Sequence, residues 1–82
     1  MIEEIGDSID VVASFAHGKM APRLFFWRNR RYRVMEITGV WSDYEGAAKR
    51  FFFSVVTDGA NIYEISFQTR TLLWRLMRIH YD

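Results

Sequence analysis

The residues best suited to chemistry lie within residues 22–34, which read P-R-L-F-F-W-R-N-R-R-Y-R-V. Five arginines and four aromatic rings stand within these thirteen residues. Guanidinium groups bind phosphates and aromatic rings stack on nucleobases, so this composition suits a surface that holds single-stranded nucleic acid. It suits equally well a β-hairpin whose rings are core and whose arginine stems lie solvated over a sheet. The segment marks a candidate binding surface without deciding its function.

The remaining side chains do not suggest catalysis. The two histidines, His17 and His80, begin no metal-binding motif. Asp43 and Glu45 could be imagined as the carboxylate pair of a hydrolase, but the polar sequence around them offers no apolar setting for a general acid. The five glycines are scattered singly, and the chain has no cysteine, so a phosphate-binding loop and a thiolate nucleophile are both excluded. We therefore expect a protein that is not an enzyme and that holds neither a metal ion nor a cofactor.

Length and composition predict one small domain. A chain of 82 residues buries a modest core, and with 17% aromatic residues some rings should lie in the surface, where they could serve a partner. The absence of cysteine favours the reducing cytoplasm. The first residues, M-I-E-E-I-G-D, are acidic where a signal peptide would be basic, and no apolar run is long enough to span a bilayer. We expect a cytoplasmic protein with no membrane partner.

Charge divides the chain into two parts. Residues 1–20 carry four acidic residues and one lysine, a net charge of −3, whereas residues 21–82 carry ten basic and six acidic residues, a net charge of +4. A strand is expected near residues 9–15, where apolar and polar residues alternate. We expect this strand to lie at a sheet edge within an acidic N-terminal segment, and residues 21–82 to form a small β-barrel-like domain that folds without it.

Alternating hydrophobicity broken by turn residues predicts strands almost throughout. The expected strands cover residues 9–15, 24–28, 31–37, 50–57, 62–67 and 73–81. A two-residue turn is expected at Asn29-Arg30, and the longest loop at Ser42–Gly46. The strand at residues 50–57 is apolar on both faces, which is typical of a central strand or of one covered by a partner.

These strands predict an all-β fold, an antiparallel meander of five to six short strands. So few residues can cover both faces of the apolar strand only if the sheet curls into a small, partly open barrel. The curl should bring one residue from each of five successive strands into a single core. These core residues are Trp27, Val34, Phe53, Ile65 and Trp74.

Four motifs resemble an uncharacterised family of small bacterial β domains. They are W-R-x-R-R-Y-R-V-x-E at Trp27–Glu36, the tryptophan Trp41, Y-E-(I/L) at Tyr63–Ile65, and W-R-L-x-R-(I/V)-x-x-D at Trp74–Asp82. Members of that family tend to have glycine where Arg30 stands and a Thr-Gly turn where this chain has Thr71-Leu72, so two turns depart from the pattern. The resemblance implies a small all-β fold with no assigned activity, and at most a loose association with DNA repair.

Two functional hypotheses remain besides the purely structural one. The favoured hypothesis is a non-enzymatic interaction module whose exposed rings bind a protein partner or a second copy. The alternative is a single-stranded nucleic-acid-binding domain, in which arginines contact phosphates while exposed members of Phe26, Trp27, Tyr32 and Trp74 stack on bases. Strict alternation in the last strand would place Arg78 and His80 on one face with Trp74 and Leu76. The candidate binding surface consists of Arg28, Arg31, Arg33, Arg75, Arg78, Phe26 and Tyr32.

Overall fold

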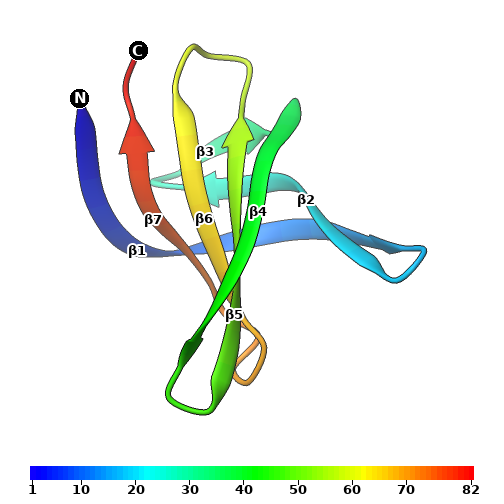
Figure 1. The fold of residues 1–82 in the computed structure, drawn as a ribbon. Helices are drawn as coiled ribbons and strands as arrows, with labels where there is room; N and C mark the ends of the chain where they lie inside the picture. The colour runs from blue at the N-terminus through cyan, green and yellow to red at the C-terminus, as the bar shows by residue number, and fades with distance from the viewer.

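The protein is built from seven strands and contains no helix (Figure 1). The structure is a computed structural model that describes residues 1–82. The strands are β1 (Ile2–Ala16), β2 (Lys19–Trp27), β3 (Arg30–Arg33), β4 (Glu36–Glu45), β5 (Ala48–Val56), β6 (Ile62–Gln68) and β7 (Trp74–His80). The chain has no helix of the length and apolar character needed to cross a membrane. The all-β prediction is confirmed.

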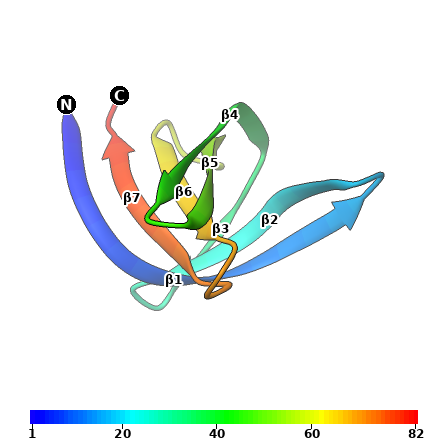
Figure 2. The same ribbon diagram turned by 60° about the horizontal axis from the view of Figure 1, so that its bottom comes forward.

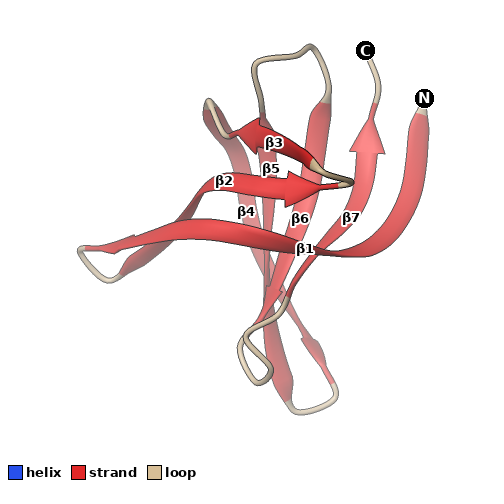
Figure 3. Ribbon diagram, turned by 180° about the vertical axis from the view of Figure 1, so that it is seen from behind, coloured by secondary structure: helices blue, strands red, loops and turns tan.

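All seven strands form one antiparallel sheet in the order β3-β2-β1-β7-β6-β5-β4. Strands adjacent in sequence are adjacent in the sheet except β3 and β4, which lie at its opposite edges. The first and last strands, β1 and β7, pair with each other, so the two chain ends lie side by side and Ile2 is opposite His80 (Figure 1). The sheet curls but does not close, and β3 and β4 are its two edges (Figure 3). The meander is confirmed, with seven strands instead of five to six and without barrel closure.

The chain crosses from one edge of the sheet to the other at Val34 and Met35. The N–H of Val34 donates to the carbonyl of Arg23 in β2, at 2.9 Å, while the next N–H, that of Met35, donates to the carbonyl of Val56 in β5, at 2.8 Å. Two consecutive backbone amides are therefore hydrogen-bonded to β2 and β5, strands that lie near opposite edges of the sheet. The sheet can satisfy both only by curling.

Four β-bulges produce the bend that this crossing requires. The register shifts between Glu4 and Asp7 in the β1–β7 ladder, between Val12 and Ala13 in the β1–β2 ladder, and once each in the β4–β5 and β6–β7 ladders. Gly6, inside the first of these shifts, has a φ of 77°, a conformation that glycine adopts without strain. Each bulge bends its strand, and β1 turns from running beside β7 to running with β2 across the other strands (Figure 2).

The concave side of the curled sheet holds the hydrophobic core. Nine buried residues form one cluster: Ile9, Phe25, Phe53, Val55, Tyr63, Ile65, Trp74, Leu76 and Ile79. Three of the five predicted core residues, Phe53, Ile65 and Trp74, belong to it, and the other two, Trp27 and Val34, are half-buried against it. Burying this many large side chains is the main stabilising contribution available to so small a domain.

Three local predictions are wrong in detail. The β2–β3 turn is Arg28-Asn29, where both residues have positive φ (51° and 61°), so Arg30 begins β3 instead of ending the turn. The polar stretch predicted as the longest loop is mostly strand, because β4 continues to Glu45 and turns at Gly46. The single strand expected over residues 31–37 is split by the crossing between β3 and β4.

The expected edge position of the N-terminal strand is also wrong. β1 is fifteen residues long and pairs with β2 on one side and with β7 on the other. Its Ile9 belongs to the core, and the Tyr81 hydroxyl donates to Glu3 at 2.6 Å, a hydrogen bond that raises the pKa of Tyr81. The strand joins the β2–β3 hairpin to the rest of the sheet, so residues 1–20 are an integral part of the fold.

A chain that begins at Ala21 should therefore fail to fold. It loses both ladders of β1 and exposes the core side of β7 and β2, a loss larger than a small domain can tolerate. Circular dichroism and urea unfolding of the shortened and full-length chains test this. A cooperative unfolding transition in the shortened chain would contradict the central role of β1.

Candidate functional site

A bulge in β7 decides which face of the sheet carries its arginines. Ile65 is opposite Leu76 but Glu64 is opposite Arg78, so Met77 is the extra residue. The side chains beyond Met77 change face, which puts Ile79 in the core and Arg78 on the convex face, away from Trp74 and Leu76. The prediction from strict alternation is therefore wrong for Arg78 and His80.

Arg78 is held in an intramolecular cluster. Its guanidinium contacts Glu4 at 3.1 Å and Glu64 at 3.2 Å, and the hydrogen bond that it donates to Glu4 is the main cause of the raised pKa of Arg78. Glu64 is buried and also lies 2.7 Å from the ring nitrogen of His80. Arg78 is the one arginine paired with the buried Glu64 carboxylate and it is also paired with Glu4, so it is a structural residue and is not available to a phosphate.

Arg28 and Arg75 are also engaged within the chain. Arg28 lies 4.5 Å above the Trp27 ring and 3.7 Å from Asp7. Arg75 donates to the carbonyl of Gly6 at 3.1 Å, which covers the bulge in β1. Neither side chain is buried, but each stabilises the local backbone.

Most of the candidate stacking rings belong to the core side. Tyr32 stacks on Phe25 with ring centroids 4.9 Å apart and contacts Tyr63 at 5.4 Å. Trp27 donates its ring N–H to Asp7 at 2.8 Å, and Trp74 is buried. These rings pack against neighbouring side chains and are not free to receive a base.

Three of the seven predicted site residues come together on the convex face of β2 and β3. Phe26, whose side chain is 42% exposed, lies opposite Arg31, and Arg33 follows two residues later with no ion pair. The neighbour of Phe26 on the other side is Asp10 of β1. This surface therefore combines one ring and two free arginines with a carboxylate that repels phosphate.

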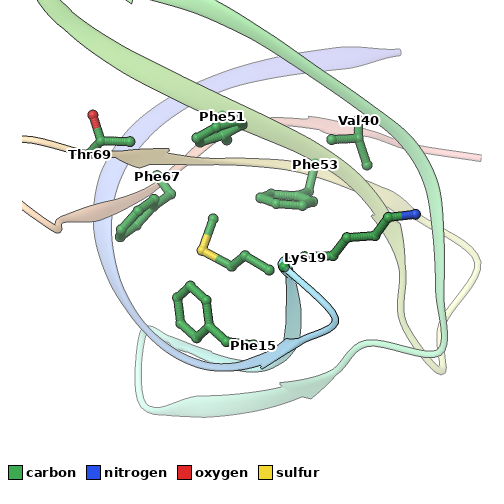
Figure 4. Close-up of a pocket in the computed structure, with 9 residues that line it drawn as sticks. Phe15, Lys19, Val40, Phe51, Phe53, Phe67 and Thr69 are labelled. Carbon is green, nitrogen blue, oxygen red and sulfur yellow. The ribbon is translucent and has the colours of Figure 1, made fainter.

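The most apolar opening in the protein lies elsewhere, between the tip of the β1–β2 hairpin and the concave face of β4, β5 and β6 (Figure 4). It has a volume of about 610 Å³. We call it the apolar groove, and it is lined by Phe15, Gly18, Lys19, Met20, Val40, Phe51, Phe53, Phe67 and Thr69. Phe15 is 76% exposed at its mouth. The groove lies where β2 pairs with β1 alone, because β3 pairs only with residues 24–27 of β2.

Two lysines border the groove. Lys19 is the only charged residue that lines it, and the ammonium group of Lys49 lies 5.0 Å from the ring centroid of Phe51, which forms part of its floor. Neither lysine forms an ion pair. The groove is thus apolar inside and positively charged at its border.

The edge strand β4 forms one wall of the groove and is well anchored. Arg50 of β5 donates two hydrogen bonds to Asp43 of β4, at 2.8 and 2.7 Å, and these lower the pKa of Asp43 and raise that of Arg50. Trp41 stacks on Phe52 with an angle of 2° between the ring planes, and the Arg50 guanidinium also lies over the Phe52 ring. β4 is therefore an ordered edge whose outer side remains unpaired.

The groove was missed because its residues are distant in sequence. Phe15 precedes a His-Gly turn, and Phe51 belongs to the strand predicted over residues 50–57, whose two apolar faces indicate a central strand or one covered by a partner. The apolar residues on both faces of this strand were the one sequence feature that indicated an uncovered apolar surface. Its convex face is covered by Trp41, whereas part of its concave face opens into the groove.

No group of three or more histidine, aspartate and glutamate side chains lies in an arrangement that could hold a metal ion. The Glu64–Arg78–His80 cluster lies on the convex face, and Oε2 of Glu64 contacts both Arg78 and His80. What the structure offers a ligand is an apolar groove, an unpaired strand edge and a small arginine patch.

Together these features define a small all-β domain with one open, curled sheet. A scan of protein families matches residues 1–81 to the family described as a domain of unknown function, DUF6504. The chain belongs to this family. Searches of curated proteins and of solved structures gave no match.

The Asp43–Arg50 ion pair should make the free energy of unfolding depend on pH. The pKa of Asp43 is lower in the folded chain, so the contribution of the pair is complete above the ordinary aspartate pKa of about 4 and is lost as the pH falls through the lowered value. The difference in free energy of unfolding between the native chain and Asp43→Asn should be constant above about pH 5 and should shrink below about pH 4.

Urea unfolding at a series of pH values measures this difference. Asp58→Asn is the control for removing a carboxylate, because Asp58 is exposed and forms no ion pair. A difference for Asp43→Asn that does not change with pH would show that the pair does not stabilise the β4 edge through its charge.

Proposed function

We propose that this protein is a non-enzymatic interaction module that binds a protein partner in the apolar groove. The observation that carries the proposal is the combination of open apolar side chains and an unpaired strand edge at one place. Phe15, Val40, Phe51 and Phe67 all line the groove, and β4 beside it pairs on one side only. Apolar openings of this kind, bordered by polar residues, are typical of protein-binding surfaces.

The position of Phe15 favours a partner over a purely structural role. A large ring that is 76% exposed contributes little to the stability of the folded chain. It projects from the hairpin tip toward a floor of further rings (Figure 4). A partner segment that filled the groove would bury Phe15 together with that floor, and buried aromatic anchors supply most of the energy of many interfaces.

A display library of random peptides tests the proposal. Peptides selected on the native chain should lose at least about tenfold in affinity with Phe15→Asp, since truncating an anchor ring costs this much or more. Val12→Asp is the matched control, because Val12 is an exposed apolar residue of the same strand and does not line the groove. Calorimetric titration measures both variants.

The outcomes are distinct. Equal losses in both variants, or none in either, would place the binding site elsewhere. A library that yields no binder would contradict the proposal. A native chain that is dimeric in solution and becomes monomeric with Phe15→Asp would identify the occupant of the groove as a second copy.

Nucleic acid is the second candidate, and it depends on Phe26 with the unpaired Arg31 and Arg33. Two phosphate contacts to a single strand imply that affinity falls about sevenfold between about 50 and 200 mM salt. Arg31→Ala with Arg33→Ala should abolish binding of all sequences alike, because phosphate contacts carry no base information. Arg70→Ala, at an exposed arginine in the turn before β7, is the control. No retention of an oligothymidylate at low salt would exclude this candidate.

A further inference from the structure

The unpaired side of β4 presents a regular row of backbone groups along the groove. Glu45 and Ala48 flank a two-residue turn, so they exchange both hydrogen bonds and the pairs alternate from there. Lys49 agrees with this pattern, because its carbonyl accepts from Thr69 and therefore points away from β4. The N–H and C=O groups of Tyr44, opposite Lys49, consequently face outward, and those of Ser42 and Val40 follow at the period of two residues.

The side chains of the same residues face the concave side. Val40 lines the groove, and Ser42 and Tyr44 lie on its face of the strand by alternation. A segment that paired with β4 would have its directly opposite residues on this same face. Backbone pairing with β4 would therefore direct alternate side chains of the added segment into the groove.

We propose that the occupant of the groove is an extended peptide segment of another protein that adds to β4 as an antiparallel or parallel strand, with apolar residues at alternate positions and an acidic residue among them. This inference rests on the proposed function and specifies its ligand. The acidic residue follows from Lys19 and Lys49, which border an apolar groove and have no carboxylate partner in the chain. An acidic group on the ligand would pair with a lysine at the border and fix the register.

A second copy of this chain fits the edge less well. β4 carries three acidic residues, Glu36, Asp43 and Glu45, and no basic one. Asp43 is neutralised by Arg50, but pairing two copies of β4 would still bring Glu36 and Glu45 of each copy together along one ladder, and like charges on neighbouring strands are destabilising. A foreign strand that is neutral on its outer face avoids this repulsion.

The test uses a synthetic peptide of about nine residues, the length that spans an edge such as β4. Valine occupies the groove-facing positions and serine the others, and in a series of peptides one glutamate replaces each valine in turn. Each glutamate peptide is compared with two control peptides. One has lysine in place of glutamate, and the other has backbone N-methyl groups that remove the hydrogen-bond donors needed for strand pairing. Calorimetric titration gives the affinities for the native chain and its variants.

Strand addition predicts that the best glutamate peptide loses binding on N-methylation. Lys19→Glu or Lys49→Glu should weaken that peptide by about fivefold or more and should improve the matching lysine peptide. Arg70→Glu is the control for reversing an exposed positive charge. Both lysines are at least partly solvent-exposed, and melting curves of the variants show that the fold is retained.

The two proposals fail differently. Binding that Phe15→Asp abolishes, but that neither N-methylation nor lysine reversal changes, would overturn strand addition and leave the groove as the binding site. Binding that survives Phe15→Asp would overturn both proposals. If no peptide of the series binds while library-selected peptides do, the groove has an occupant of another chemistry and the inference is wrong.

Discussion

Two consecutive peptide bonds impose the constraint on which this structure depends. The N–H of Val34 is bonded to β2 and that of Met35 to β5, although these strands lie near opposite ends of the sheet. An unpaired amide inside a fold is costly, so the sheet curls until both bonds form. The curl then gives Phe53, Ile65 and Trp74 a common core, and it leaves the part of β2 beyond β3 paired with β1 alone. The core and the apolar groove are thus two results of one crossing.

The arginine-rich hairpin has a different role from the one its composition suggests. Arg28 lies on Trp27 at a turn with positive φ, Tyr32 stacks against Phe25, and Arg78 neutralises a buried glutamate. These contacts are local or cross-strand and hold the curled sheet together. Charge and aromatic rings that look like a ligand-binding surface in sequence are here used largely for internal packing, because in so small a domain few side chains can be spared from it.

The open apolar surface is concentrated where internal packing ends. The groove lies between the hairpin tip and the concave face, where the strand order leaves both a floor of rings and the free side of β4. Sheet edges usually carry features that prevent association, and β4 has three acidic residues of this kind. The concave face of the same strand has apolar Val40 instead, beside two unpaired lysines. The edge therefore carries acidic residues and also borders an open apolar groove.

Alternation and turn residues in the sequence determined the all-β class, the meander and most of the core, because these depend on local preference and on period-two burial. The sequence could not show that β1 is a central strand, because its acidic charge does not indicate which strands pair with it. It also could not show that Met77 is a bulge residue that moves Arg78 to the convex face. Of the site residues predicted from the sequence, only Phe26, Arg31 and Arg33 lie together in the structure. The groove unites Phe15, Val40 and Phe67 from three distant segments, and only the tertiary curl, set by long-range hydrogen bonds, brings such residues together.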